Sequence, residues 1–528
     1  MGGYHSNEGL GAIVGYVLVA FLAIQYVRST RALRAVAVTA VAAASLVSAY
    51  ALLQFVGVDP FGWVNDTGRV FATLGNPDML GTYLVFPLAL AAGLAMSPPR
   101  GRSAFAWWVV TALIAGALVA TLTRGAWIGA LAVASSIALV GRAGEWKTQR
   151  SRKLLVGGLL IAAAAASAAI VAIRPRLAGG ATTLAGLLTS LSNGRTVIWT
   201  TGLRGWLAHP ITGWGPDGFG AAFQSAVGAD WYAIVDGLQT TVNAHDIFVQ
   251  TLVTLGIPGL ALTSWALGRA AGVSLHGLRP AKGPSRILLV ALWGALIGMI
   301  VALVFGVTVP AVTVWLWLTV GLLLAPLSHR VAAPHRALLA TGAVVGLALA
   351  VWAGTWQVAD VMVGRAMQMQ PGSAQVAQLT AATRLNPITP NYDWLLAEAM
   401  VNDAIAQQKA GASSRVVDEV MLKAISAFET AAGANRGDAM LRSAFSNVLV
   451  GFAARHPGTN AAARAVETAL EAVRLAPGNP AALGALARAY AVSGRRADAE
   501  QAALRARAVA PAYAAQTLGS LGLGTTAP

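Results

Sequence analysis

The sequence contains no cysteine, and only 11% of its 528 residues are charged, whereas an ordinary soluble chain carries about 25% charged residues. The lack of cysteine excludes a disulfide framework, a thiol nucleophile and a Cys-ligated metal. The scarcity of charge, together with 56% hydrophobic residues, excludes a soluble globular protein. The formal net charge of +16 requires another explanation, either a nucleic-acid partner or membrane topology.

Several catalytic signatures are missing as well. The sequence holds no Asp-x-Asp pair, no His-Glu-x-x-His motif and no Walker-type glycine loop. Metal-dependent sugar transfer, metalloprotease chemistry and nucleotide hydrolysis therefore lack their usual ligands. We accordingly expect no cofactor and no metal ion.

Long apolar runs dominate the first two thirds of the chain. A helix needs about 20 apolar residues to cross about 30 Å of hydrocarbon, so each run is a candidate membrane span. Two runs are short, and the pattern predicts about 10 to 12 transmembrane helices. The ten runs cover residues 9 to 27, 35 to 57, 79 to 96, 104 to 122, 126 to 140, 154 to 173, 247 to 267, 287 to 309, 312 to 327 and 337 to 356.

The loops between these runs predict the orientation. Five alternate connections carry sixteen Lys and Arg residues, and seven Asp residues fall on the opposite side. The positive-inside rule makes the basic loops cytoplasmic, so both termini are expected outside. The +16 charge then reflects topology, and no nucleic-acid partner is expected. A sugar donor used outside the cell must arrive already activated on a lipid, because no nucleotide sugar is present there.

Two outer segments are too long to be simple connections, namely residues 174 to 246 and the tail after 356. Long loops of this length are usually functional. In the first, leucines between 184 and 191 predict one helix, and a second helix runs through Trp199 to a stop at His209. We therefore expect an extracytoplasmic helical loop beside the membrane.

The tail repeats with the 34-residue period of tetratricopeptide motifs. Ala465 and Ala469 recur as Ala499 and Ala503, within an alanine-rich helical pattern. We predict a linker at 357 to 371 and an extracytoplasmic TPR-like α-solenoid at 372 to 528, after a transmembrane domain at 1 to 356. Such a solenoid offers a concave surface to a protein partner, and a stabilising cap without a ligand is the alternative.

Three ionisable residues lie beside the predicted spans. Arg124 is at the tip of a helical hairpin, where a functional anion ligand and a snorkelling side chain are both consistent with the pattern. Arg195 begins a helix, so its guanidinium would join free backbone N–H groups in an anion site, unless it pairs with an outer aspartate. His245 has the ordinary pKa for proton transfer near neutral pH, and Asp246 or Asp236 could orient its ring; a structural histidine is the alternative.

The motifs around these residues resemble the O-antigen ligase and polymerase superfamily, over roughly residues 50 to 330. A further segment from Arg69 to Asp78 resembles the outer loop of members with tetratricopeptide tails. The order and the common outer location of the motifs make the set specific. The motifs are Arg-Gly-x-Trp at 124 to 127, Gly-Arg-x-x-Ile-Trp at 194 to 199, His-Pro-x-x-Gly-x-Gly-Pro at 209 to 216, Ala-His-Asp-x-Phe at 244 to 248, and Leu-Gly-Ile-Pro-Gly at 255 to 259.

The resemblance implies an all-α, polytopic membrane helical bundle of the GT-C type, in the inner membrane. It also implies an inverting, metal-independent glycosyltransferase that moves a glycan from undecaprenyl diphosphate to a glycan, lipid or protein acceptor at the outer face. The two arginines and one histidine of the family match Arg124, Arg195 and His245. Asn commonly follows that histidine in the family, whereas this chain has Asp246.

The expected chemistry agrees with these residues. Breaking a glycosyl diphosphate bond requires stabilisation of the departing phosphate charge, which two guanidiniums supply without a divalent ion. We assign Arg124 and Arg195 to the diphosphate, Arg69 to an additional phosphate or acceptor contact, and His245 to the acceptor hydroxyl. The supporting residues predicted around them are Asp246, Asp236, Asn243 and Trp199.

Two other classes of function stay open at this point. A flippase or exporter of lipid-linked glycans would need ionisable residues along its spans, and these spans are nearly free of charge. An outward scaffold would use the solenoid for recruitment and the spans only as an anchor among membrane lipids. Within the enzyme class, ligation to lipid A core, polymerisation and transfer to protein share one donor chemistry, so the acceptor is not determined.

Overall fold

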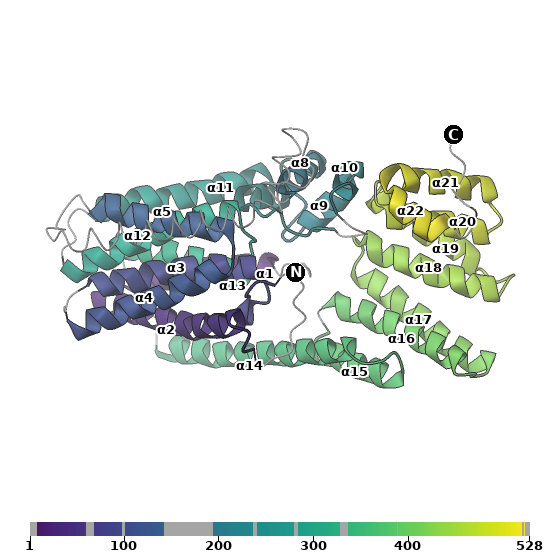
Figure 1. The fold of residues 1–528 in the computed structure, drawn as a ribbon, viewed down its shortest axis with the longest axis horizontal. Coiled ribbons are helices and arrows are strands. Elements are labelled where there is room, and N and C mark those ends of the chain that lie inside the picture. Colours follow the sequence, from purple (N-terminus) through teal and green to yellow (C-terminus); the bar gives the residue numbers. More distant parts are fainter. Residues whose placement is uncertain are drawn as a thin grey trace. The chain divides into compact units, whose positions relative to one another are not determined.

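The computed structural model is all-helical within the ranges that it describes, and it has no strand there (Figure 1). This agrees with the predicted all-α class. The chain forms two compact units, one made of residues 1–219 and 242–331 and the other of residues 220–241 and 332–528. We call them the first and the second unit. The described ranges are 8–59, 68–97, 101–141, 194–235, 240–278, 283–327, 336–387, 389–519 and residue 522.

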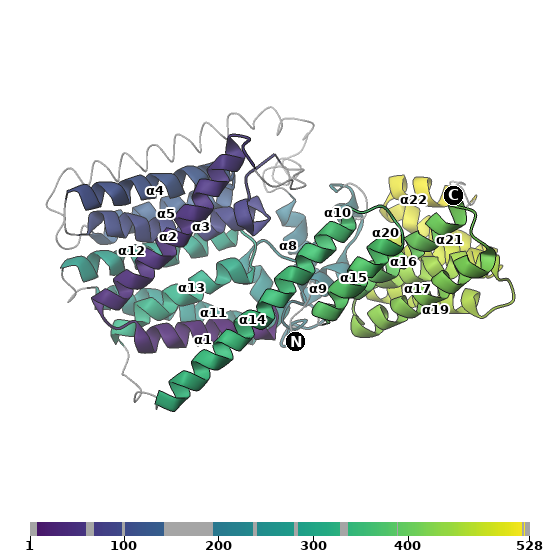
Figure 2. The same cartoon turned by 90° about the horizontal axis from the view of Figure 1, so that it is seen from below.

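The first unit is a bundle of long apolar helices, in which α3 is buried by α4, α5 and α12 (Figures 1 and 2). Asn76 begins α3, because its side chain accepts hydrogen bonds from the backbone N–H groups of Asp78 and Met79. The elements are α1 (Leu10–Tyr26), α2 (Thr30–Phe55), η1 (Ala72–Leu74), α3 (Pro77–Met96), α4 (Arg102–Ala120), α5 (Arg124–Gly141), α8 (Arg195–Trp206), α11 (Ile247–Gly277), α12 (Gly283–Val304), α13 (Pro310–Leu324) and η2 (Ala325–Leu327).

Six helices in the described part of the chain are long and apolar enough to cross a membrane. They are α2, α3, α4, α11, α12, and α13 extended through η2, while α1 and α5 are shorter apolar helices. Eight of the ten predicted runs coincide with these elements. The run at 154 to 173 lies outside the described residues, and the run at 337 to 356 falls within a helix that is not among the six. Several apolar helices nevertheless indicate a multi-pass membrane protein.

Close packing between α5 and α12 depends on small residues. A Cβ atom added to Gly129 would lie 2.7 Å from the carbonyl oxygen of Gly298 and 2.8 Å from the Cβ of Ala302. A Cβ added to Gly125 would lie 2.8 Å from the Cβ of Phe305. Helices inside a membrane associate through such close approaches. The contact fixes the first turn of α5, which begins with Arg124.

Replacement of Gly129 by valine is expected to lower the thermal unfolding midpoint of the purified protein by several degrees. The added side chain meets backbone and side-chain atoms of α12, and overpacking of this kind costs about 1–3 kcal/mol. Gly116→Val on α4 is the matched control, because a Cβ there meets nothing within 4 Å. Equal midpoints for the two variants would contradict this packing.

The second unit consists of successive helical pairs with an alanine-rich core. Two pairs of alanines, each 34 residues apart, are fully buried: Ala465 with Ala499, and Ala469 with Ala503. Alanine at these positions lets neighbouring helices approach closely. The helical pairing agrees with the predicted pattern, and the assignment to tetratricopeptide repeats stays a prediction. The elements are α9 (Phe219–Ala226), α10 (Ala229–Tyr232), α14 (Arg336–Met367), α15 (Ser373–Leu385), α16 (Pro390–Lys409), α17 (Ser414–Ala434), α18 (Ala439–Arg455), α19 (Ala461–Leu475), α20 (Pro480–Val492), α21 (Arg496–Val509) and α22 (Pro511–Leu518).

The prediction of a linker at 357 to 371 is wrong for most of its length. Helix α14 continues to Met367, and Ala359 and Ala366 are fully buried in small clusters with residues of α15 and α16. Small apolar residues recur at helical spacing in this segment and form a face that packs against other helices. The amino-acid composition of the segment did not indicate such a face. The following helix begins at Ser373, and a domain boundary at 372 stays a prediction.

The long loop at 174 to 246 is divided between the two units. Its part from 220 to 241 groups with the repeats, because α10 contacts α21 and because Val227 lies against the loop before α20. A Cβ on Gly478 would lie 2.0 Å from the carbonyl oxygen of Val227. The domain boundaries in the structure therefore differ from the predicted division at 356. The predicted helix at 184 to 191 lies outside the described residues.

Candidate functional site

Arg69 joins the start of α3 to the turn between α4 and α5. Its Nη2 donates to Asp78 Oδ1 at 2.7 Å and to Thr123 Oγ1 at 2.8 Å, while its Nε donates to the carbonyl oxygen of Thr121 at 2.8 Å. Thr123 Oγ1 in turn donates to the carbonyl oxygen of Pro77 at 3.0 Å. A mostly buried pair with this many hydrogen bonds keeps a fixed geometry. Arg69 is therefore engaged with Asp78, and this pairing was not predicted.

Arg124 is the first residue of α5, as the predicted hairpin requires. The preceding turn is tight, since Leu122 has a left-handed backbone with φ of 53°. Two further residues of the Arg-Gly-x-Trp motif position the arginine. Gly125 lets α5 approach Phe305, and the Nε1 of Trp127 donates to the carbonyl oxygen of Leu118 on α4 at 3.3 Å.

Arg195 is the first residue of α8, after Gly194 with a φ of 75°. Burial lowers the pKa of Arg195, the carboxylate of Asp78 raises it, and the charges of Arg124 and Arg69 lower it further. These effects arise only if Asp78, Arg124 and Arg69 each lie within electrostatic reach of Arg195. An arginine nevertheless stays charged at neutral pH. Within the described part of the chain, the guanidiniums of Arg69 and Arg124 and the carboxylate of Asp78 thus lie near Arg195.

The loop that carries His245 is fixed by hydrogen bonds on both sides. Asn243 Oδ1 accepts from the backbone N–H of His245 at 2.9 Å, and Asn243 Nδ2 donates to the carbonyl oxygen and the hydroxyl of Thr308, both at 3.0 Å. The carbonyl oxygen of Ala244 accepts from Trp199 Nε1 at 2.9 Å. Two of the predicted supporting residues, Asn243 and Trp199, therefore hold the peptide bond that precedes the histidine.

The backbone of His245 is left-handed, with φ of 54°. Such a conformation costs free energy for a non-glycine residue and persists only where the surroundings impose it. Burial lowers the pKa of His245 to about 4, the charge of Arg195 lowers it as well, and Asp78 opposes both effects. The imidazole is consequently neutral at pH 7. Its buried Nδ1 has no hydrogen-bond partner among the described residues.

The expected orientation of the histidine ring by Asp246 is not observed. Asp246 Oδ1 accepts from the backbone N–H groups of Phe248 at 2.7 Å and Val249 at 2.8 Å, so the side chain caps α11 instead. Burial raises the pKa of Asp246 and these two hydrogen bonds lower it. Asp236, the other candidate, lies outside the described residues. The backbone N–H groups in the first turn of α11 have no partner within the helix. The adjacent carboxylate of Asp246 accepts hydrogen bonds from them and is therefore not available to the histidine ring.

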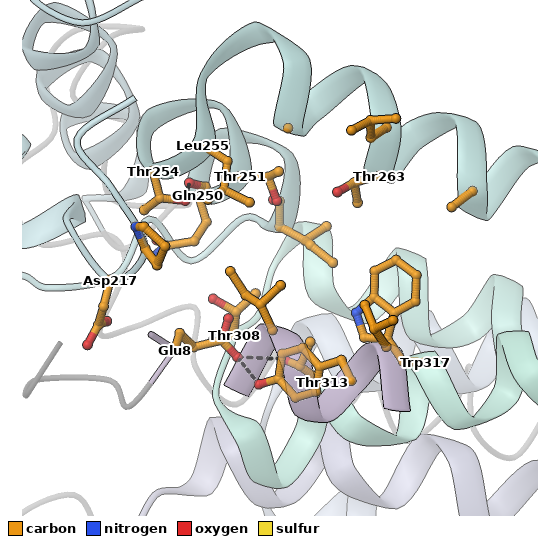
Figure 3. A pocket seen from close by; sticks show the side chains of 18 of the residues that line it. Glu8, Asp217, Gln250, Thr251, Thr254, Leu255, Thr263, Thr308, Thr313 and Trp317 are labelled. Carbon is orange, nitrogen blue, oxygen red and sulfur yellow. Dashed lines mark hydrogen bonds between the residues drawn. The ribbon is translucent and has the colours of Figure 1, made fainter. Parts of the chain in front are cut away.

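A cavity of about 410 Å³ adjoins the same loop, between α1, α11 and α13 (Figure 3). Gln250 and Thr308 line the cavity, and both also bind the histidine loop: Gln250 Oε1 accepts from Ala244 N at 2.8 Å. Sequence reasoning missed this cavity and Glu8, which lines it. Glu8 precedes the first apolar run, and only the packing of α1 against α13 brings it to the site.

The fold and the site define a class, namely a multi-pass membrane protein with a cationic, histidine-containing site built from the starts of its helices. A family model for O-antigen ligase matches residues 109–264, a range that includes Arg124, Arg195 and His245. The match supports an O-antigen ligase or polymerase type of membrane glycosyltransferase. No protein in the curated comparison set matches the chain.

Proposed function

We propose that the protein transfers a glycan from undecaprenyl diphosphate to an acceptor hydroxyl, with inversion and without a metal ion, at the outer face of the inner membrane. The observation that carries this proposal is that Arg195 interacts electrostatically with Arg69 and Arg124 and also with a neutral His245. A site with several fixed guanidiniums suits an anionic diphosphate, and an uncharged imidazole suits a hydroxyl group.

The diphosphate is assigned to Arg124 and Arg195. Arg69 is paired with Asp78 at 2.7 Å, so the assignment falls on the other two arginines. Both begin helices, and the backbone N–H groups of a first helical turn favour an anion as well. Arg69 then acts as a positioning residue, because it holds Thr121 and Thr123 immediately before Arg124.

The reaction is a single displacement. A lone pair of the acceptor hydroxyl forms the new bond to the anomeric carbon, and the bond from that carbon to the diphosphate oxygen breaks with its electron pair on the leaving group. The guanidiniums stabilise that developing charge. His245 orients the hydroxyl and takes its proton as the new bond forms; a base with a pKa of about 4 becomes effective only when the hydroxyl turns acidic in the transition state.

The experiment uses the purified full chain in nanodiscs with a fluorescent undecaprenyl-diphosphate glycan. Donor alone, donor with lipid A core and donor with candidate acceptor proteins are incubated separately, each with and without EDTA. We expect a glycan product in at least one reaction and no effect of EDTA. Elongation with donor alone identifies a polymerase, and a product only with lipid A core identifies a ligase.

Two outcomes would contradict the proposal. Loss of product in EDTA with recovery after Mg²⁺ would show that the arginines do not replace a metal ion. Movement of the intact donor across the membrane, without any new glycosidic bond, would identify a flippase.

A further inference from the structure

The cavity between α1, α11 and α13 has one polar end and one apolar end. In Figure 3, Glu8, Asp217, Gln250 and Thr254 lie toward one side, whereas Thr263 and Trp317 lie toward the other. A volume of about 410 Å³ falls within the range of about 300–1,000 Å³ that is usual for small-molecule sites. The shape and lining suit an amphipathic molecule.

Two carboxyl groups mark the polar end. Glu8 Oε1 accepts hydrogen bonds from Tyr16 Oη at 2.7 Å and from Thr313 Oγ1 at 2.9 Å, and Asp217 is 8% exposed. Burial raises the pKa of Glu8, the two hydrogen bonds lower it, and the charge of Asp217 raises it again. Neither Lys nor Arg occurs among the described residues that line the cavity. The lining therefore offers a phosphate no cation to pair with, whereas hydroxyl groups would find several acceptors.

The apolar end opens beside the bundle. Val17 on α1 and Leu262 and Trp265 on α11 line the cavity, yet they are 60%, 66% and 65% exposed. Exposed apolar side chains on membrane-crossing helices face hydrocarbon. An alkyl or isoprenoid chain can therefore enter the cavity sideways from the bilayer, with its polar group toward Glu8.

The polar end also adjoins the proposed reaction centre. Ile247 and Gln250 line the cavity, and Ile247 follows His245 by two residues. Thr308 lines the cavity as well and accepts from Asn243 at 3.0 Å. The cavity and the loop that carries His245 thus share Gln250 and Thr308, so a molecule bound in the cavity lies next to this loop.

We propose that this cavity binds the acceptor, and that the acceptor is an uncharged glycolipid with a hydroxyl-bearing sugar head and an apolar chain. The inference rests on the proposed glycosyl transfer and names the substrate class for its second site. Glu8 and Asp217 accept hydrogen bonds from the sugar hydroxyls, and the chain lies along Trp265 and Trp317. The diphosphate donor binds at the arginines and not in this cavity, because only the arginines, among the described residues of the two places, supply positive charge.

The test uses two photoactivatable probes with the same diazirine-labelled dodecyl chain, one with a glucoside head and one with a phosphate head. The full chain in nanodiscs is labelled over a concentration series, and the crosslinked peptides are identified by mass spectrometry. We expect saturable labelling of α11 and α13 by the glucoside, at a half-saturating concentration at least about tenfold below that of the phosphate.

Three variants locate the binding. Thr263→Trp fills the apolar end and is expected to raise the half-saturating concentration of the glucoside at least about tenfold. Ser264→Trp is the matched control, because Ser264 is exposed, adjacent and outside the cavity lining, and it should bind as wild type does. Glu8→Gln removes a charge. It should weaken binding of the glucoside probe by about threefold or more and strengthen binding of the phosphate probe.

Equal or tighter binding of the phosphate probe, or glucoside labelling unaffected by Thr263→Trp, would overturn the acceptor assignment. The glycan-transfer assay on the same preparations separates this result from the proposed function. Protein that transfers glycan but does not bind the glucoside contradicts only the cavity. Protein that binds the glucoside but transfers nothing from any lipid-linked donor contradicts only the reaction.

Discussion

Replacement of Arg195 by alanine is expected to lower kcat for glycan transfer by about 10²- to 10³-fold, and Arg124→Ala is expected to do the same. Each change removes a guanidinium that would stabilise the departing diphosphate. The lysine variants should recover only part of the rate, because an ammonium group keeps the charge but loses the planar, bidentate geometry. Single-turnover transfer from a fluorescent lipid-linked donor measures the effect directly.

Arg204→Ala is the matched control for Arg195. Arg204 lies in the last turn of the same helix, α8, whereas Arg195 lies at its start. Its replacement should leave the rate within about twofold of wild type, since most substitutions away from a site have small effects. If Arg195→Ala and Arg204→Ala both transfer glycan at the wild-type rate, the diphosphate does not bind at Arg195.

The second large effect concerns His245. His245→Gly is expected to lower the transfer rate by about 10²- to 10⁴-fold, because it removes the group assigned to the acceptor proton. Glycine adopts the left-handed backbone at this position without strain, so the loop should keep its conformation. Added imidazole should restore part of the activity of the glycine variant, and a purely structural role of the side chain would not allow that rescue.

The pH profile gives an independent measurement. A base is active in its neutral form, so the wild-type rate should fall as the pH decreases through the pKa of His245, which burial and Arg195 lower to about 4. We expect a rate that is flat from about pH 5.5 to about pH 8, instead of an acidic limb near the ordinary value of about 6.5. His245→Gly should lose the limb near pH 4. A wild-type limb at about 6.5 that the glycine variant lacks would contradict the buried, neutral imidazole.

The helix-start positions of two proposed site residues could be predicted because the signals are local. Arg124 and Arg195 are rare charges beside apolar runs, and each stands at a position where the sequence pattern predicts a helix start. The structure places both at such starts, in α5 and α8. Asn243 and Trp199 were expected near the histidine, and both hold its loop through hydrogen bonds to Thr308 and Ala244.

Other features could not be read from neighbouring residues. The pairing of Arg69 with Asp78 depends on the turn that contains Thr123, far along the chain. Asp246 follows the histidine directly, yet its carboxylate accepts a hydrogen bond from the first turn of α11 and caps that helix. The extension of α14 through the predicted linker depends on contacts with α15 and α16, which composition does not show.

The sequence by itself determined the helical class, the membrane-crossing character and the identity of three ionisable residues, because hydrophobic period, helix starts and isolated charges are properties of short segments. Only the tertiary structure decided which charges meet. The shared environment of Arg195 and His245, and the cavity that Glu8 reaches through the packing of α1 on α13, arise from segments that are separated by tens to hundreds of residues. Electrostatic interaction and burial depend on distance in space, which helix packing sets and local sequence does not encode.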